Sequence, residues 1–193
     1  DLVKKHPINL LLGSIFEKAP AGKAYNCSIA ISPDLKMTKY RKINLFEARL
    51  GDKIIRESDC MVPGDKTEMV DVEEFKVGLS VCYDLRFPAL YQTYAKQGAT
   101  ALTVPSCFTK ITGQAHWESL LRARAIENLC YVLAPNQVGA DARGVESYGH
   151  SMVVDPWGEI IACASSNKEE IIYAEISMEK VKEARGKLPG IFI

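Results

Sequence analysis

The sequence predicts an α/β fold in which strands and helices form a layered sandwich. Short apolar runs bounded by turn residues recur along the chain, which is typical of strands. Helical patterns stand between several of these runs, as in folds that layer helices on sheets. The 193 residues are 47% hydrophobic and 25% charged, which describes an ordinary globular chain. We therefore expect a single domain over residues 1–193.

The first half of the chain is predicted to consist mainly of strands. Pro20, Ala21 and Gly22 form the turn between the first two strands, which we expect to be antiparallel neighbours. Residues 43–66 lack periodicity and contain Gly51-Asp52 and Pro63-Gly64, so we expect a long loop there. The expected strands span residues 8–14, 25–32, 35–40, 67–72 and 75–82.

The second half alternates helices with strands. Pro88 begins a helix near residues 88–97, because proline fits a first helical turn. Residues 114–129 form the clearest helix, and a last helix spans residues 178–187. The apolar face of the clearest helix carries Trp117, Leu120, Leu121, Ala125 and Asn128. The expected strands span residues 100–105, 130–136, 149–155, 159–164 and 170–175, with the turn Asp155-Pro156-Trp157-Gly158 between two of them.

Charge and cysteine usage exclude several classes of function. The chain carries 24 acidic and 24 basic side chains and no basic block, so we expect neither nucleic acid nor a membrane as a partner. No apolar run approaches the roughly 20 residues of a membrane span, and the start lacks a secretory hydrophobic region. We expect a cytoplasmic location, or an organelle if an N-terminal segment precedes these residues. The six cysteines lack a CxxC or zinc spacing, so we expect reduced thiols and no metal.

The stretch VGLSVCYDLRFPALY, residues 77–91, contains the first candidate for chemistry. Cys82 stands where a buried strand stops and a charged turn begins, a place where α/β sheets commonly present reactive groups. Buried cysteines usually fill the core, and we interpret Cys27 and Cys130 in this way. For Cys82 the pattern leaves both a nucleophile and a core residue open.

A thiol nucleophile needs a base and a group that stabilises the oxyanion. His116 and His150 are candidates for the base, although structural hydrogen bonding is the commoner role for such residues. Lys42 stands at the end of a predicted strand and Glu57 lies in the long loop. Taken singly, each of these two charges is typical of a solvated surface.

Several linked segments resemble the carbon-nitrogen hydrolase (nitrilase) superfamily. They are KYRKINLF at 39–46, RESDCMVPGD at 56–65 and VGLSVCYDLRFP at 77–88, followed by PSCFTKITGQAHWESLLRARAIENLCYVLAPNQVG and YGHSMVVDPWGEIIA, which resemble the Nit branch. The resemblance implies a four-layer α-β-β-α sandwich of the nitrilase type, here without the N-terminal strand-helix units. It also implies a small amide as substrate, no cofactor, and assembly as a homodimer or larger homo-oligomer.

The resemblance further implies roles for individual residues. Lys42 and Cys82 match the catalytic lysine and cysteine of the family, and Glu57 matches an accessory glutamate that orients the lysine. Cys82 would attack an amide carbon, ammonia would leave, and water would hydrolyse the thioester. Lys42 would lower the thiol pKa and stabilise the oxyanion with the Tyr83 backbone N–H. The expected substrate-binding residues are Tyr83, Ser106, Phe108 and Thr109.

The Nit segments look closest to the deaminated glutathione amidases, and an ω-amidase acting on α-ketoglutaramate is the alternative. The resemblance places the general-base glutamate of the family upstream of these residues, with roughly 60 to 80 residues absent. Glu17 lies in a predicted turn and does not replace it, so we expect low activity from these 193 residues alone. A non-catalytic scaffold without that glutamate is the alternative from another class. We interpret Asp84 and Arg86 as structural charges that hold the turn.

Overall fold

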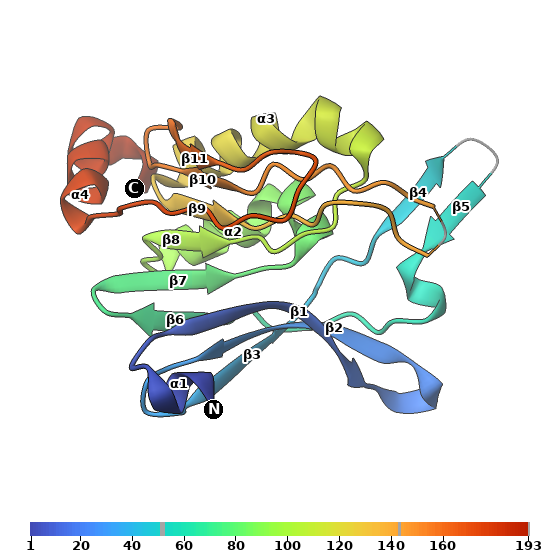
Figure 1. The fold of residues 1–193 in the computed structure, drawn as a ribbon. Coiled ribbons are helices and arrows are strands. Elements are labelled where there is room, and N and C mark those ends of the chain that lie inside the picture. Colours follow the sequence, from blue (N-terminus) through green and yellow to red (C-terminus); the bar gives the residue numbers. More distant parts are fainter. Residues whose placement is uncertain (51–52, 143, 193) are drawn as a thin grey trace.

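The computed structural model describes residues 1–50, 53–142 and 144–192, and two facing β-sheets dominate it (Figure 1). One sheet has the order β1-β2-β3, and the other has the order β11-β10-β9-β8-β7-β6. The smaller sheet consists of β1 (Leu10–Lys18), β2 (Ala24–Ile31) and β3 (Met37–Arg41). The larger consists of β6 (Met69–Val72), β7 (Phe75–Leu79), β8 (Ala101–Thr103), β9 (Tyr131–Ala134), β10 (Met152–Val154) and β11 (Ile160–Cys163).

The strand pairing follows the chain closely. Strands β1, β2 and β3 are successive antiparallel neighbours, as the sequence predicts. In the larger sheet β7, β8 and β9 run parallel, and antiparallel strands flank them on both sides. Parallel strands need long crossovers, and α2 (Pro88–Lys96) and α3 (Lys110–Asn128) supply them.

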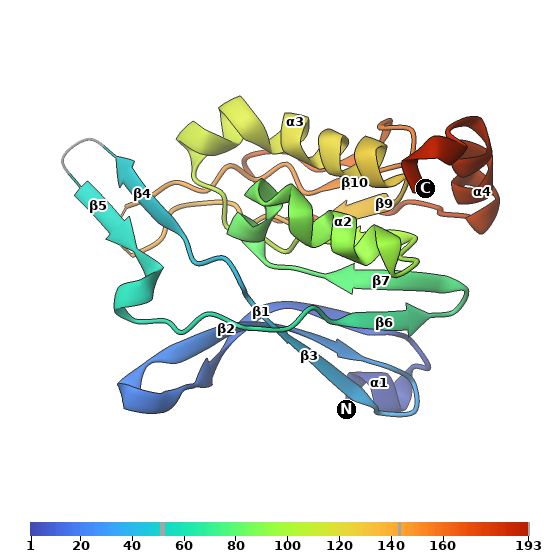
Figure 2. The ribbon, with the colours of Figure 1, turned by 180° about the vertical axis from the view of Figure 1, so that it is seen from behind.

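Helices α2 and α3 cover one face of the larger sheet (Figure 2). Thr109 caps α3 by accepting a hydrogen bond from the Thr112 N–H, so this helix begins before the predicted residue 114. Its predicted apolar stripe is confirmed, because Trp117 and Leu121 are fully buried. The remaining helical segments are α1 (Leu2–Lys5), α4 (Met178–Lys187), η1 (Pro20–Gly22), η2 (Glu57–Asp59), η3 (Cys82–Arg86) and η4 (Pro189–Phe192). Within the described ranges, no helix is long and apolar enough to cross a membrane.

Alternation along the strands of the larger sheet builds two hydrophobic cores. Leu102 on β8 packs toward α2 and α3, in the core that also contains Trp117. Its neighbour Ala101 points to the opposite side and joins Val77 and Tyr40 between the two sheets. Because both faces of the larger sheet are covered, its strands are apolar at successive positions. The layers thus run from helices to the larger sheet to the smaller sheet, and the predicted α/β layered class is confirmed.

The predicted long loop over residues 43–66 is wrong. It contains an antiparallel hairpin of β4 (Glu47–Leu50) and β5 (Lys53–Arg56), followed by η2. The hairpin projects from the body of the molecule (Figure 1), and polar and apolar residues alternate only over Glu47–Leu50, a run too short to separate a strand from a loop in sequence. The predicted turn residues Gly51 and Asp52 lie outside the described residues.

Two further expectations differ from the structure. Strand β1 extends to Lys18, so Glu17 lies in a strand and not in a turn. Residues 170–175 form no strand, although a short apolar run between two glutamates is typical of one. Ile171 and Tyr173 are 78% and 84% exposed. A strand needs a neighbour that completes its hydrogen bonds, and among the described residues none pairs with this segment.

Candidate active site

Cys82 occupies a tight turn at the end of β7. Its backbone has φ 51, in the left-handed region that residues other than glycine seldom adopt. The Cys82 N–H donates to the Pro105 carbonyl oxygen at 3.0 Å, and the Asp84 N–H donates to the Val81 carbonyl oxygen at 3.1 Å. These bonds hold the strained residue, whose side chain is half-buried and contacts both cores.

Lys42 follows β3 directly, and backbone contacts fix it on both sides. Its N–H donates to the Asn26 carbonyl oxygen, and its own carbonyl oxygen accepts from the Gly64 N–H, each at 2.8 Å. A Cβ on Gly64 would lie 2.2 Å from the Arg41 carbonyl oxygen, so only glycine allows this approach. The end of β3 is thereby clamped beside the turn that carries Cys82.

The Lys42 side chain is buried and forms an ion pair with Glu57. Its exposed fraction is 1%, and Nζ lies 2.6 Å from Glu57 Oε2. The same carboxylate oxygen accepts the Phe46 N–H at 2.7 Å, which fixes the carboxylate in turn. The structure therefore brings Lys42 and Glu57 together, in the arrangement expected of an accessory glutamate that orients the lysine.

The thiol of Cys82 lies within electrostatic reach of this pair. The pKa of Cys82 is raised overall by burial and the Glu57 carboxylate, and the Lys42 ammonium and the Cys107 backbone N–H oppose this rise. A nearby cation favours the thiolate, which is the nucleophilic form of cysteine. Lys42, Glu57 and Cys82 thus gather at one site although they are far apart in sequence.

Tyr83 joins this site to the projecting hairpin. Its ring packs edge-on against Phe46 and Phe87, with ring centroids 5.1 and 5.5 Å away. Its hydroxyl donates to the Glu47 carbonyl oxygen at 3.3 Å. The β4–β5 hairpin therefore forms one wall beside the nucleophile turn.

The other expected substrate-binding side chains have structural partners. Ser106 is buried and donates its hydroxyl to the Val104 carbonyl oxygen at 3.0 Å. Phe108 is 4% exposed and packs on Trp117 with ring centroids 4.8 Å apart. Thr109 caps α3. These contacts support the fold, and Phe108 belongs to the core against which Cys82 packs.

The two histidines considered as bases also have other partners. His116 Nδ1 lies 3.3 Å from Nη1 of Arg86, and His150 Nδ1 lies 3.0 Å from the Tyr148 carbonyl oxygen. Both contacts fit the structural interpretation.

The Arg86 guanidinium lies 5.2 Å from the centre of the Phe108 ring, and among the described residues it forms no ion pair with a carboxylate. Arg86 is thus a half-buried cation four residues after Cys82 in the chain.

Cys107 was not singled out by the sequence reasoning. It is exposed, its Sγ lies 3.2 Å from Ser147 Oγ, and its backbone N–H lowers the pKa of the Cys82 thiol. Its neighbours Ser106 and Phe108 are both buried, which only the structure reveals. Extended residues alternate between two faces, so the residue between them had to face outward.

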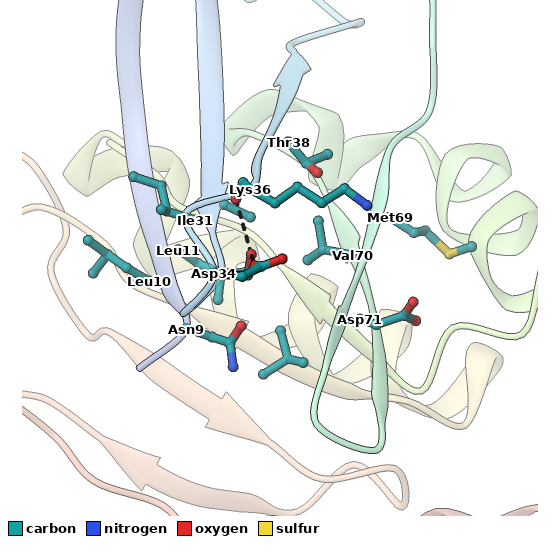
Figure 3. Close-up of a pocket in the computed structure, with 13 residues that line it drawn as sticks. Asn9, Leu10, Leu11, Ile31, Asp34, Lys36, Thr38, Met69, Val70 and Asp71 are labelled. Carbon is teal, nitrogen blue, oxygen red and sulfur yellow. Dashed lines mark hydrogen bonds between the residues drawn. The ribbon is translucent and has the colours of Figure 1, made fainter. Parts of the chain in front are cut away.

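A separate pocket of about 270 Å³ lies between the two sheets, toward the start of β3 (Figure 3). Lys42 follows the carboxyl end of β3 and Cys82 follows the carboxyl end of β7, whereas the pocket lies at the start of β3. The pocket is therefore distinct from their site. It contains no cysteine, and its polar groups mix Asp34 and Asp71 with Lys36. Its lining consists of Asn9, Leu10, Leu11, Ala30, Ile31, Ser32, Asp34, Lys36, Thr38 and residues 69–72.

Comparison with protein families assigns the chain. Residues 1–186 match the family model described as carbon-nitrogen hydrolase. The chain belongs to the carbon-nitrogen hydrolase family. The resemblance seen in the sequence and the amide-hydrolysing class that it implies are thereby confirmed.

Individual relatives of this carbon-nitrogen hydrolase are similar over most of its length. Omega-amidase NIT2 of Homo sapiens is 41% identical over 191 residues, which cover 98% of this chain and 68% of that protein. A deaminated glutathione amidase of Synechocystis is 42% identical over 175 residues, 89% of this chain and 64% of the relative. The crystal structure of the Caenorhabditis elegans NitFhit protein superposes with a TM-score of 0.91 at 43% identity, and the match covers 98% of this chain and 47% of that one.

Proposed function

We propose that this chain carries the nucleophile of an amidase that cleaves a linear amide through a thioester on Cys82. The observation that carries the proposal is the Lys42 ammonium, which is 1% exposed, paired with Glu57 and close enough to Cys82 to favour its thiolate. A cation held dry beside a thiol favours charge on the sulfur and on an adjacent oxyanion. A purely structural lysine would have no reason to lie beside a reactive group.

The first half of the reaction forms the thioester. The Cys82 thiolate attacks the amide carbon, and the carbonyl oxygen becomes an oxyanion that the Lys42 ammonium and the Tyr83 N–H stabilise. When the C–N bond breaks, the amide nitrogen takes up a proton and leaves as ammonia. The acyl group stays on the sulfur, so the amide and the thiol have become a thioester and ammonia.

The second half regenerates the thiol. Water adds to the thioester carbonyl, and the same donors stabilise the second oxyanion. The C–S bond then breaks, the carboxylic acid leaves and Cys82 recovers its proton. Glu57 keeps its charge throughout, because its task is to hold Lys42 by the 2.6 Å contact.

We propose deaminated glutathione as the substrate, with α-ketoglutaramate as the competing candidate. Both carry carboxylates, and the Arg86 guanidinium next to the nucleophile turn offers a forked partner for one. Support also comes from the relatives, which are named for these two activities at similar identity. Because the identities are so similar, direct competition between the two substrates is the decisive comparison.

The test is mass spectrometry of the full protein, quenched in acid during turnover with each ω-amide. We expect a mass increase equal to the acyl group, located on the peptide that contains Cys82 and removed by hydroxylamine. Cys82→Ala should abolish the adduct and ammonia release, whereas Cys163→Ala, which removes another exposed thiol, should leave both unchanged. A folded protein that forms no adduct and releases no ammonia from any ω-amide would reject the amidase in favour of a non-catalytic scaffold.

A further inference from the structure

Asp84 is a fully buried carboxylate in η3, two residues after Cys82. Oδ2 accepts from the Tyr40 hydroxyl at 2.8 Å and from the Val81 N–H at 2.9 Å. Oδ1 accepts from both the backbone and the side-chain N–H of Asn44, each at 2.9 Å. The carboxylate is thus held by hydrogen-bond donors, and no ion pair involving it occurs in the described part of the chain.

The partners of Asp84 flank both candidate catalytic residues. Val81 directly precedes Cys82, whereas Tyr40 and Asn44 stand two positions before and two positions after Lys42. One side chain therefore joins the end of β3 to the nucleophile turn. Resting on the roles proposed above for Lys42 and Cys82, we propose that Asp84 is a positioning residue that holds the lysine beside the thiol.

The geometry requires a carboxylate at this position. Each oxygen of an ionised carboxylate accepts two hydrogen bonds, which matches the donors that converge here. An asparagine amide would present its own N–H groups to one pair of these donors, so one of the two connections would break. Burial raises the pKa of Asp84, and the bonds from Asn44, Val81 and Tyr40 lower it. When one member of such a buried network is changed, its partners are left without hydrogen bonds, which costs free energy of folding.

The same residue also maintains the strained turn. Its N–H donates to the Val81 carbonyl oxygen at 3.1 Å while its Oδ2 accepts the Val81 N–H, so two bonds close the loop around Cys82. Loss of these bonds would let Cys82 leave φ 51. Lys42 and Cys82 would then move independently, and the cation would lower the thiol pKa less.

The test measures the alkylation rate of Cys82 by iodoacetamide between pH 6 and pH 10, by peptide mass spectrometry on the full protein. Asp84→Asn and Tyr40→Phe are the test variants. We expect the apparent Cys82 pKa to rise in both, with the rate at pH 7 about tenfold lower in Asp84→Asn, since one pKa unit changes the thiolate fraction tenfold. With an ω-amide, kcat should fall while KM changes less than about twofold.

Matched controls separate positioning from general destabilisation. Asp155 is also fully buried and accepts two backbone N–H bonds, at 2.8 and 2.9 Å, in a turn outside the site. Tyr131 is a buried tyrosine whose hydroxyl accepts the Ser177 N–H. Asp155→Asn and Tyr131→Phe should lower the melting temperature and leave the Cys82 profile unchanged.

Each outcome decides the role of Asp84. If Asp84→Asn and Tyr40→Phe both fold and Cys82 alkylation depends on pH as in the wild type, Asp84 is not a positioning residue. If Asp84→Asn does not fold, the alkylation profile of Tyr40→Phe tests the role of Asp84, because this variant removes one hydroxyl and keeps the ring. If neither variant folds, the role of Asp84 is purely structural. Alkylation needs no substrate, so it tests the role of Asp84 even if the amidase function is rejected. A thioester on Cys82 with unchanged profiles would reject the role of Asp84 alone.

Discussion

Replacing Glu57 with glutamine separates the charge of this residue from its shape. Glu57 Oε2 accepts both from Lys42 Nζ at 2.6 Å and from the Phe46 N–H at 2.7 Å. A glutamine carbonyl oxygen fits the same place and accepts both bonds. The substitution therefore removes one negative charge and leaves the buried Lys42 ammonium without the one ion-pair partner that the described residues give it.

The magnitude follows from the burial of the two partners. Breaking a buried ion pair from one side costs about 3–5 kcal/mol, because the remaining charge is left uncompensated. The Glu57 side chain is 20% exposed, so water already weakens the pair, and we expect a loss of about 2–3 kcal/mol in the free energy of unfolding. The Glu47–Arg56 pair on the adjacent β4–β5 hairpin is 60% and 49% exposed, so Glu47→Gln should cost less than about 0.5 kcal/mol.

The assay is guanidinium chloride unfolding followed by tryptophan fluorescence, in which Trp117 reports the buried core. In a double-mutant cycle, Lys42→Met should recover most of the loss caused by Glu57→Gln, because the uncompensated charge is then absent. Glu57→Gln should also speed alkylation of Cys82, because it removes the carboxylate charge that raises the pKa of the thiol while the amide oxygen keeps its bond to Lys42. A Glu57→Gln protein within about 0.5 kcal/mol of wild type, with no coupling to Lys42→Met, would refute this account of the pair.

Two further predictions concern stability. Gly64→Ala should cost about 1–3 kcal/mol, because its Cβ would lie 2.2 Å from the Arg41 carbonyl oxygen, and melting temperatures should show no such loss for Gly186→Ala, where nothing lies within 4 Å. Burial raises the pKa of Cys130 from 9.0 to about 11, so the unfolded thiol loses its proton first as pH rises. Its stabilisation is therefore complete below pH 9 and lost as pH rises toward 11, by about 2–3 kcal/mol in total. The free energy of unfolding of Cys130→Ala, measured by denaturation at several pH values, should fall less steeply between pH 9 and pH 11 than that of the wild type. The same pH dependence in both proteins would contradict the prediction.

Sequence periodicity predicted the elements whose buried face follows from their own pattern of apolar residues. The stripe that contains Trp117 and Leu121 follows one face of α3, and the apolar run toward Cys82 contains the interior strand β7. The hairpin of β4 and β5 was missed because each strand is only four residues long, and the alternation of Glu47–Leu50 is too short to mark a strand. The segment 170–175 has a strand-like apolar run but no pairing neighbour in the described residues, and pairing is a property of two segments.

The amino-acid sequence is enough to identify the chemical groups of the candidate site and the family of the chain. It shows a thiol after a buried strand, with Lys42 and Glu57 at upstream spacing. How these groups act on one another depends on the folded chain. Folding buried Lys42 against Glu57, joined both segments through Asp84 and turned Cys107 outward. The physical reason is that burial and distance depend on the register of strands far apart in sequence, where a shift of one residue moves every side chain to the opposite face.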